Sequence, residues 1–522
     1  MTQRPLGDLV RELEARGMLR TVLAPASVPV GAILIGGVCF DSRSAASGDL
    51  FVAVPGAETD GHDFAAAAAK AGAVAILGER AVAGVNVPQV LVSSARSALA
   101  VAGAWVNGFP SHRLGIVGVT GTDGKTTTCF LVRAMLGECA QPAGLISTIE
   151  VIVAGESVGY TGHTTPEAPV IQSDLRRMAD AGDRFAVIET TSHGLALERV
   201  AEVAYDIAVF TNMTHEHLDL HGTYDAYVAA KRSLFEGLAV SPSNPQKAWP
   251  KGAVVNAQDE RGPEMAAAAR AAGARVLTYA VGPDVNADIV ATTVHDDGRR
   301  LSMRVRTARW EDDLRLQLPG RFNAFNALAA IGVGEILGLD PAAMRRGLAS
   351  VKSVAGRMEP IDEGQPFDVF VDFAHTPGAL AAALDALGPV AAARGGSLIA
   401  LFGSPGARDV AKRPMMGRAA GERSRVVVLT DDDPRTEDEM GILEEISVGA
   451  VEAGRHRDRD LFLIPDRAAA IRRALELARP GDIVLLAGKG HEPTLATAAG
   501  PIPWDEAQIA REALHDMGYR AR

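Results

Sequence analysis

The stretch Leu114-Gly-Ile-Val-Gly-Val-Thr-Gly-Thr-Asp-Gly-Lys-Thr-Thr-Thr128 decides the fold of this chain. Its apolar start predicts a buried strand, its glycines at positions 118, 121 and 124 predict a loop, and the apolar pattern of residues 129–136 predicts a helix. Such a strand, loop and helix form a phosphate cradle, because the first N–H groups of a helix point at a bound anion. Lys125 adds a positive charge, and Thr126 can hold Mg²⁺.

This loop departs from the strict phosphate-loop pattern in one position. The pattern has glycine six residues before the lysine, where this chain has Val119, and Gly118 lies one residue earlier. The alternative interpretation is a glycine-rich turn that binds nothing. A lysine followed by threonines at the start of a helix serves no packing purpose, so we favour the phosphate-binding loop.

Composition limits the class of protein. The chain has 522 residues, too many for one core, and we expect about three domains. Its net charge of -12 and the absence of a basic block argue against a nucleic-acid partner. The N-terminus lacks the apolar core of a signal peptide, and the longest apolar run, residues 31–40, is far shorter than the ~20 residues of a membrane span. We therefore expect a cytoplasmic protein without membrane insertion.

The three cysteines show no metal-binding spacing. Cys129 falls within the apolar pattern of the helix that follows the loop, so a buried thiol is expected there.

Hydrophobic periodicity divides the chain into three parts. Residues 1–110 have the pattern of a small α/β domain, which ends in an expected linker at residues 109–112. Residues 111–355 alternate strand and helix patterns, as in a parallel sheet covered on both faces, and residues 356–522 do so again. The expected buried strands of these two domains include residues 185–189, 206–210, 367–371, 398–402, 425–429 and 482–486.

Polar residues follow two of these strands in the middle domain, Glu189 to His193 and Thr211 to His217. Ligands bind at the carboxyl ends of strands in open α/β sheets, so both clusters should face the phosphate loop. Glu189 is placed to hold Mg²⁺ opposite Thr126, unless it caps the next helix. The segment 212–222 contains three histidines and two acids, which favours a second cation or phosphate site over a zinc or a purely structural site.

Polar residues also follow the strands of the last domain, as in Gly488-Lys-Gly-His-Glu492, a weak signal alone. Residues 432–435, Asp-Asp-Pro-Arg, predict a turn, after which Thr436 would cap a helix that starts at Glu437. Arg435 could grip a carboxylate of a ligand, or it could pair with Asp432 or Asp438.

Together these strings resemble the Mur ligases, the ATP-dependent amide-forming enzymes of peptidoglycan synthesis, over nearly the whole chain. The matching segments are 41–43, 48–53, 60–62, 121–126, 164–166, 189–195, 212–222, 320–323, 356–358, 372–377, 432–435 and 488–492. The resemblance implies an α/β fold of three domains: a small N-terminal UDP-sugar-binding domain, a central P-loop ATPase domain with a parallel sheet, and a C-terminal Rossmann-like domain that binds an amino acid.

The resemblance also assigns roles to individual residues. It implies that the catalytic residues are Lys125, His217 and Lys231. The implied ATP-binding residues are Gly121, Thr122, Asp123, Gly124, Lys125, Thr126, Thr127, Asn323, Arg357, Asp372 and His375. The implied contacts of the UDP-linked substrate are Ser42, Thr164, Thr165, Ser192, Arg199 and Lys231, and the implied Mg²⁺ ligands are Thr126, Glu189, His217 and Lys231.

Lys231 matches the carbamylated lysine of the family. An ammonium beside Mg²⁺ would be repelled, whereas a carbamate is an anion that can ligate the ion. Without the resemblance, Lys231 would be interpreted as a solvated lysine on a helix.

The implied pocket for the incoming amino acid consists of Arg408, Asp432, Asp433, Pro434, Arg435, Gly488 and Glu492. The string usual for diaminopimelate-adding members is Asp-Asn-Pro-Arg, so Asp433 is a departure. Arg435 favours diaminopimelate, because lysine would leave the guanidinium without a carboxylate partner. Asp433 could instead favour the cationic end of lysine or ornithine.

The implied reaction joins meso-2,6-diaminopimelate to the D-glutamate of UDP-N-acetylmuramoyl-L-alanyl-D-glutamate through an acyl phosphate, with ATP and Mg²⁺. We expect a cytoplasmic monomer that serves cell-wall growth, and with it cell shape and division. The alternatives are the same ligation with lysine or ornithine, a sister ligase that adds D-alanyl-D-alanine or extends folate, a non-catalytic nucleotide-binding regulator, and a P-loop hydrolase switch. The regulator is disfavoured, since Lys125, Glu189, His217 and Lys231 are all present.

Overall fold

The computed structural model describes residues 3–25, 28–56, 59–159, 162–214, 221–239 and 249–520. The chain divides into two compact units, the first of residues 1–279 with 329–340 and the second of residues 280–328 with 341–522. His217 and most of the polar segment 241–250 lie outside the described residues. Within the described part of the chain, no helix has the length and apolar character that a membrane crossing requires.

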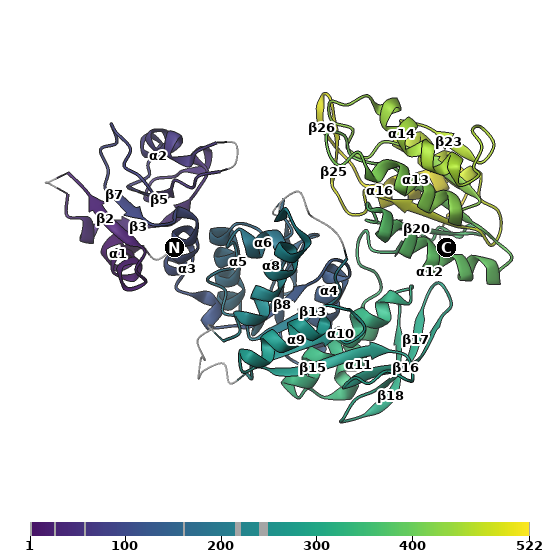
Figure 1. Cartoon of the computed structure of the whole chain (residues 1–522), viewed down its shortest axis with the longest axis horizontal. Helices are drawn as coiled ribbons and strands as arrows, with labels where there is room; N and C mark the ends of the chain where they lie inside the picture. Colours follow the sequence, from purple (N-terminus) through teal and green to yellow (C-terminus); the bar gives the residue numbers. More distant parts are fainter. Residues whose placement is uncertain are drawn as a thin grey trace. The chain divides into compact units, whose positions relative to one another are not determined.

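The first hundred residues of the first unit form a five-stranded sheet (Figure 1). Its strands run in the order β2 (Leu19–Leu23), β7 (Gln89–Val92), β6 (Ala75–Gly78), β5 (Asp49–Val52) and β4 (Gly37–Cys39). The helices of this region are α1 (Leu6–Ala15), α2 (Ala65–Ala71) and α3 (Ala95–Asn107), and β1 (Arg4–Pro5) pairs with β3 (Leu34–Ile35). Apolar residues of α1 and α3 pack against the sheet in one core. This sheet corresponds to the small N-terminal domain expected from the sequence.

The segment expected to be a linker is instead part of the packed structure. Residues Pro110–His112 form the 3-10 helix η4, in which Pro110 and Ser111 are buried. The Ser111 hydroxyl accepts a hydrogen bond from the Ala204 N–H at 3.2 Å, which holds the segment against the middle of the unit.

A second sheet of the first unit surrounds the phosphate loop. Its strands run in the order β11 (Glu156–Gly159), β10 (Val151–Val153), β9 (Ala143–Ile146), β12 (Phe185–Glu189), β8 (Gly115–Thr120), β13 (Ile207–Phe210), β14 (Gly252–Asn256) and β15 (Arg275–Val281). The pairs from β9 to β15 are parallel, as predicted. The helices are α4 (Lys125–Glu138), α5 (Ala168–Ala181), α6 (Ser192–Ala196), α8 (Tyr224–Glu236) and α9 (Gly262–Ala271).

Successive residues of these strands point to opposite faces of the sheet, and both faces are covered. Ile116, Ile188 and Phe210 share one core with residues of α5, α8 and α9. Their neighbours Val117 and Val119 are buried too, since both faces of a parallel sheet are covered. Cys129 is fully buried in α4, as expected, and burial raises the pKa of its thiol.

Gly118 lies in strand β8 and not in the loop. A Cβ on Gly118 would lie 2.6 Å from the ring of Tyr205, so this glycine makes room for an aromatic side chain. The loop proper therefore starts at Gly121, which explains why the strict phosphate-loop spacing fails in this sequence.

The second unit begins with an antiparallel ribbon of β16 (Ile289–Asp296), β17 (Leu301–Arg306) and β18 (Glu311–Leu316). Helix α10 (Phe322–Leu337), which belongs partly to each unit, and α11 (Pro341–Ser350) follow it.

The rest of the second unit is built on a six-stranded sheet (Figure 1). Its order is β19 (Glu359–Pro360), β20 (Asp368–Asp372), β24 (Ile483–Ala487), β21 (Leu398–Phe402), β22 (Val426–Leu429) and β23 (Leu461–Leu463). The helices are α12 (Pro377–Ala393), α13 (Lys412–Arg423), α14 (Glu439–Glu452), α15 (Arg467–Glu476) and α16 (Glu506–Asp516), and β25 (Thr494–Thr497) pairs with β26 (Gly500–Pro503). Apolar residues of α12, α13 and α14 cover one face, and those of α15 and α16 cover the other. Helices on both faces make this sheet doubly wound.

The predicted strands are confirmed to within one or two residues, whereas the exact domain limits at 110/111 and 355/356 stay a prediction. The prediction that a helix starts at Glu437 is wrong, because helix α14 starts at Glu439. Its N-cap is Asp438, whose carboxylate accepts from the Gly441 N–H at 2.7 Å, and not Thr436. Glu437 is used otherwise, since its carboxylate accepts from the Ala407 N–H and from Arg413.

Candidate active site

The loop after β8 is hydrogen-bonded to the residues that follow β13. Gly121 has a φ of +148°, and a Cβ there would lie 1.9 Å from Oγ1 of Thr211, so only glycine fits. The Thr122 N–H donates to the carbonyl of Asn212 at 2.8 Å, and the Asp123 N–H donates to Asn212 Oδ1 at 2.9 Å. The polar cluster at the end of β13 therefore meets the phosphate loop, as predicted.

The start of α4 suits an anion. Its N-cap is Gly124, with a φ of +79°, and no side chain caps the helix. The first N–H groups of a helix lack partners within it and carry a partial positive charge. Thr126 and Thr127 are buried at this start. Lys125 Nζ lies over the loop and donates to the carbonyls of Gly121 at 3.1 Å and Thr122 at 2.7 Å.

Glu189, at the end of β12, joins three segments. Its Oε1 accepts from the Thr126 hydroxyl at 3.0 Å. Its Oε2 accepts from the N–H and hydroxyl of Thr148 at 3.0 and 2.9 Å. The capping interpretation of Glu189 is wrong, because Thr191 caps helix α6 and accepts from the Gly194 N–H. The arrangement places a buried carboxylate beside the hydroxyl at the helix start.

Four residues expected to bind the UDP-linked substrate gather around Glu189. The Thr164 and Thr148 hydroxyls are hydrogen-bonded at 3.1 Å, and the Thr165 hydroxyl donates to the Glu189 carbonyl at 2.8 Å. Arg199 donates to the Thr165 carbonyl at 3.0 Å. Ser192 is 1% exposed, and its hydroxyl has no partner among the described residues, so it offers a hydrogen bond to a ligand. Of the two other residues expected to contact this substrate, Lys231 lies on helix α8, and Ser42 is half-buried in the N-terminal part, in the 3-10 helix Ser42–Ser44.

Lys231 is 2% exposed, which makes the interpretation as a solvated helix lysine wrong. Helix α8 buries the face formed by Tyr227, Val228, Lys231, Leu234 and Phe235. Lys231 Nζ donates to the Gly121 carbonyl and lies 4.6 Å from the centre of the Tyr227 ring. The Tyr227 hydroxyl is in turn hydrogen-bonded to the Thr122 hydroxyl at 2.9 Å. The buried ammonium of Lys231 therefore contacts the phosphate loop directly, at the carbonyl of Gly121.

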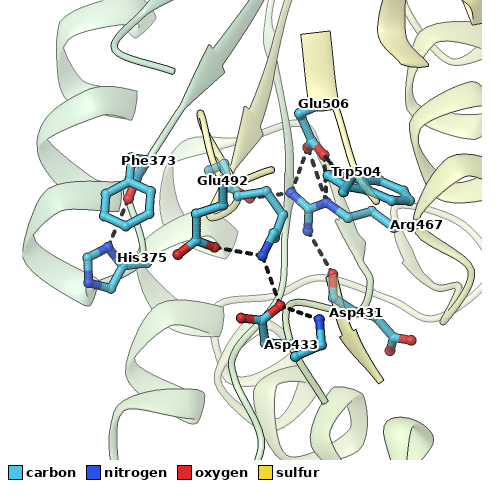
Figure 2. Close-up of polar contacts among 11 residues, drawn as sticks. Phe373, His375, Asp431, Asp433, Arg467, Glu492, Trp504 and Glu506 are labelled. Atoms are coloured by element: carbon cyan, nitrogen blue, oxygen red, sulfur yellow. Dashed lines mark hydrogen bonds and ion pairs between the residues drawn. The ribbon is translucent and has the colours of Figure 1, made fainter. Parts of the chain in front are cut away.

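The second unit holds the remaining nucleotide candidates. Asn323 donates to the Pro319 carbonyl at 2.6 Å. The Arg357 guanidinium lies 4.7 Å from the centre of the Phe373 ring. Asp372 accepts from the N–H groups of Met358 and Ala374, and His375 Nδ1 lies 2.9 Å from the Phe373 carbonyl. Arg357, Asp372 and His375 thus come together at the end of β20 (Figure 2 labels Phe373 and His375).

The expected amino-acid pocket lies where β22 and β24 end. Asp432 is buried, and potential ligand oxygens of Asp432, Asp433 and Glu492 lie within 4.8 Å of one another. Lys489 joins two of them, because its Nζ donates to Asp433 Oδ1 at 2.8 Å and to Glu492 Oε2 at 2.6 Å (Figure 2). Gly488, at the end of β24, has a φ of +106°. The turn after β22 and the glycine loop after β24 therefore form one cluster.

Burial sets the charge of this cluster. It raises the pKa of Asp432 above its usual value, against the opposing effect of Arg467 and Lys489. It raises the pKa of Glu492 as well, against Lys489. Burial would lower the pKa of Lys489, but the charges of Glu492 and Asp432 outweigh it and the pKa is raised. Lys489 is therefore a stable cation among the carboxylates.

A buried ion pair supports both loops from behind. Arg467 and Glu506 are fully buried and face each other, with Arg467 Nη2 2.6 Å from Glu506 Oε1 (Figure 2). Arg467 also donates to the carbonyls of Asp431 and Ala487, each at 2.8 Å. The Trp504 indole N–H donates to Glu506 Oε2 at 2.7 Å. One guanidinium thus connects the ends of β22 and β24.

The two arginines expected in the pocket, Arg435 and Arg408, form no ion pair with Asp432, Asp433 or Glu492 among the described residues. Arg435 is half-buried and donates to the Gly406 carbonyl at 3.2 Å, so within the described residues neither Asp432 nor Asp438 pairs with it. Pro434 is buried in the same turn, and Arg408 is exposed in the loop after β21.

Three residues of the site were not found from the sequence. Thr148 follows β9 as a strand-end polar residue, so the rule that located Glu189 could have located it. Lys489 lies inside the Gly488–Glu492 string but has no distinguishing signal in the sequence. Arg467 begins a helix and gives no local sign of its burial.

Comparison with known proteins gives three matches to family models. The Mur ligase family, catalytic domain, matches residues 34–106; the Mur ligase middle domain matches residues 119–334; and the Mur ligase, glutamate ligase domain, matches residues 356–490.

Individual relatives agree over nearly the whole chain. The UDP-N-acetylmuramyl-tripeptide synthetase of Roseiflexus sp. (strain RS-1) is 45% identical over 96% of this chain and 99% of its own length. The UDP-N-acetylmuramoyl-L-alanyl-D-glutamate--2,6-diaminopimelate ligase of Solibacter usitatus (strain Ellin6076) is 39% identical over 98% of this chain and 99% of its own length. A solved structure of a ligase with that second name is 28% identical, with a TM-score of 0.66, and covers 99% of this chain and 100% of that one. The predicted three-domain α/β fold is thereby confirmed.

Proposed function

The chain belongs to the Mur ligase family of ATP-dependent amide-forming ligases, and on this premise we propose that it joins meso-2,6-diaminopimelate to UDP-N-acetylmuramoyl-L-alanyl-D-glutamate. The acceptor is named by the Solibacter relative, and 39% identity over 98% of this chain is the observation that carries the proposal. The product would be a precursor of peptidoglycan.

The phosphates of ATP would bind at the start of α4. This helix start is uncapped and buried, so its N–H groups are available to an anion. Lys125 Nζ, now on the carbonyls of its own loop, would move to the phosphate oxygens, where its charge is better compensated.

Mg²⁺ fits the oxygen donors at this place. Thr126 and Glu189 offer a hydroxyl and a buried carboxylate 3.0 Å apart, and hard oxygen ligands are what Mg²⁺ prefers. We propose Thr126, Glu189, His217 and Lys231 as the residues that hold it. The bound ion would neutralise charge on the transferring phosphate. Lys231 would take part as a carbamate, because the anionic form is attracted to the ion that its ammonium would repel.

The chain's own residues would then hold two like-charged reactants together. Thr164, Thr165 and Arg199 would place the D-glutamate carboxylate next to the terminal phosphate, and Ser192 would add a hydrogen bond. The carboxylate attacks that phosphate to give an acyl phosphate and ADP. The amine of the amino acid then attacks the acyl carbon, and inorganic phosphate leaves. Positioning and fixed positive charge lower both barriers.

Two residues of the pocket, Arg435 and Asp433, would contact the far end of the acceptor. Diaminopimelate has a carboxylate and an ammonium at its far end, and lysine or ornithine has the ammonium alone. Arg435 would pair with the far carboxylate, and lysine would leave it without that partner. Asp433 and Glu492 would face the ammonium, which all three acceptors share. Arg435 is therefore the discriminating residue.

The test of the function offers the purified protein ATP, Mg²⁺ and the UDP-linked dipeptide with one diamino acid at a time. We expect phosphate release and a UDP-tripeptide, identified by mass spectrometry, with meso-diaminopimelate at a much higher kcat/KM than with lysine or ornithine. A higher kcat/KM with lysine would contradict the proposed acceptor but would still support a ligase of this family. No product with any of the three would reject the function.

Arg435→Ala should raise the KM for diaminopimelate roughly 10- to 100-fold, the equivalent of about 1.5–3 kcal/mol for a charged hydrogen bond. The KM for ATP should stay close to that of the unchanged protein, because Arg435 would contact the acceptor and not ATP. Initial rates at varied acceptor and varied ATP separate the two constants. Arg418→Ala is the control, since Arg418 is an exposed arginine of the same unit that pairs with Glu452. Equal effects on both KM values would remove the proposed role of Arg435.

The monomeric state stays a prediction, which light scattering of the eluting protein would test.

A further inference from the structure

Lys489 is the most deeply buried lysine of the amino-acid pocket, with an exposed fraction of 0%. Its ammonium is held by two carboxylates, Asp433 in the turn after β22 and Glu492 in the loop after β24 that also carries Lys489. A buried ammonium costs several kcal/mol of desolvation, so it persists only where its partners are well placed.

The carboxylates around Lys489 would repel one another without it. Oxygens of Asp432, Asp433 and Glu492 lie within 4.8 Å of one another, and like charges at this distance are strongly unfavourable in a buried place. The nearby Arg467 is already paired with Glu506, which is fully buried beside it. Lys489 is therefore the cation that compensates for Asp433 and Glu492.

Asp433 also fixes the backbone of its turn. Its Oδ1 accepts from the Ala496 N–H at 2.8 Å in addition to Lys489. The Ala496 carbonyl accepts from the Arg435 N–H at 3.0 Å. Asp433 and Arg435 both have positive φ values, +53° and +57°. Residues other than glycine keep this backbone conformation where surrounding contacts stabilise it. The Lys489–Asp433 pair thus helps to hold the turn that carries the Arg435 guanidinium.

We propose that Lys489 is a positioning residue that sets the affinity for the diamino acid, an inference that rests on the proposed function. By pairing with Asp433 and Glu492 it holds the turn after β22 and the loop after β24 in register. It also removes enough negative charge for the far carboxylate of diaminopimelate to approach Arg435. Lys489 does not touch the reacting atoms, so it should affect acceptor binding far more than ATP binding.

The effects of substitutions at Lys489 and Asp433 on the KM for diaminopimelate should not add up. Lys489→Met leaves two carboxylates uncompensated and should raise the KM for diaminopimelate roughly tenfold or more. Asp433→Asn removes one charge but keeps the shape, and should raise it less. The double variant K489M/D433N should have a lower KM for diaminopimelate than K489M alone, because one of the two uncompensated charges is gone and Glu492 alone remains without its cation. A cavity or packing defect at position 489 would not be relieved by the change at 433.

The experiment measures the KM values for diaminopimelate and ATP, and kcat, in the full-length protein and these three variants. The control is Arg425→Met, which removes the cation facing buried Asp482 at the opposite ends of the same two strands. R425M should lower the thermal midpoint of unfolding without raising the KM for the acceptor. Circular dichroism and thermal unfolding establish that each variant is folded.

The outcomes separate the two proposals. Partial recovery of acceptor KM in the double variant, with an unchanged KM for ATP, supports the role of Lys489. A double variant no better than K489M, or parallel losses for ATP and acceptor, overturns it. If K489M does not fold, K489M/D433N decides. A double variant that folds again supports charge compensation by Lys489, and one that also fails to fold overturns it. Failure of the unchanged protein to ligate any diamino acid would reject the proposed function itself.

Discussion

Lys125→Ala is expected to lower ADP release in the presence of the UDP-linked dipeptide by roughly three orders of magnitude. The reaction brings a carboxylate to a polyanionic phosphate, so fixed positive charge at the start of α4 should supply a large part of the barrier reduction. The structure places Lys125 Nζ over the loop, on the carbonyls of Gly121 and Thr122, within a helix start that no side chain caps. Without this charge, the N–H groups at the start of α4 would bind the phosphates with no lysine beside them.

A coupled assay for ADP measures this effect, with and without the UDP-linked dipeptide. The control is Lys70→Ala, because Lys70 is an exposed lysine of helix α2. An unchanged rate in K125A would refute the assignment of the loop to ATP. Thermal unfolding of K125A should resemble that of the unchanged protein, since Lys125 is only partly buried.

Arg467→Met should lower the free energy of unfolding of the second unit by about 3–5 kcal/mol, the typical cost of removing one partner of a buried ion pair. Glu506 would keep a fully buried charge, and among the described residues Trp504 would be its remaining side-chain partner. The carbonyls of Asp431 and Ala487 would each lose a donor as well. Because these carbonyls end β22 and β24, the KM for the diamino acid should rise together with the loss of stability.

Urea unfolding followed by tryptophan fluorescence measures this change, since Trp504 contacts Glu506 directly. The matched control is Arg472→Met on the same helix, which breaks an exposed pair with Asp516 and should cost about 0–1 kcal/mol. The double variant R467M/E506L replaces the pair by apolar groups and should recover much of the stability. If R467M were no less stable than R472M, the pair would not be the support of these loops.

The sequence predicted the scaffold well for a physical reason. The apolar runs that become β8, β12, β21 and β24 are buried on both faces, so they are continuous in the sequence and easy to locate. The polar residues that follow them, such as Glu189 and Asp432, mark the ligand edge because every parallel strand ends at the same edge. The start of α14 was misplaced, because Glu437 is held by Arg413, which lies 24 residues earlier in the chain.

The sequence by itself determined the order of strands and helices, the phosphate loop, and the edge of each sheet where the chemistry belongs. These features depend on hydrophobic periodicity and on local backbone geometry, which neighbouring residues specify. The tertiary structure alone decided the burial of Lys231, the contact of Thr148 with Glu189, and the pairing of Lys489 with Asp433. Lys231 and its partner Gly121 are 110 positions apart in the chain, Thr148 and Glu189 are 41 apart, and Lys489 and Asp433 are 56 apart. Burial and charge compensation between such distant residues depend on packing, which no local pattern in the sequence records.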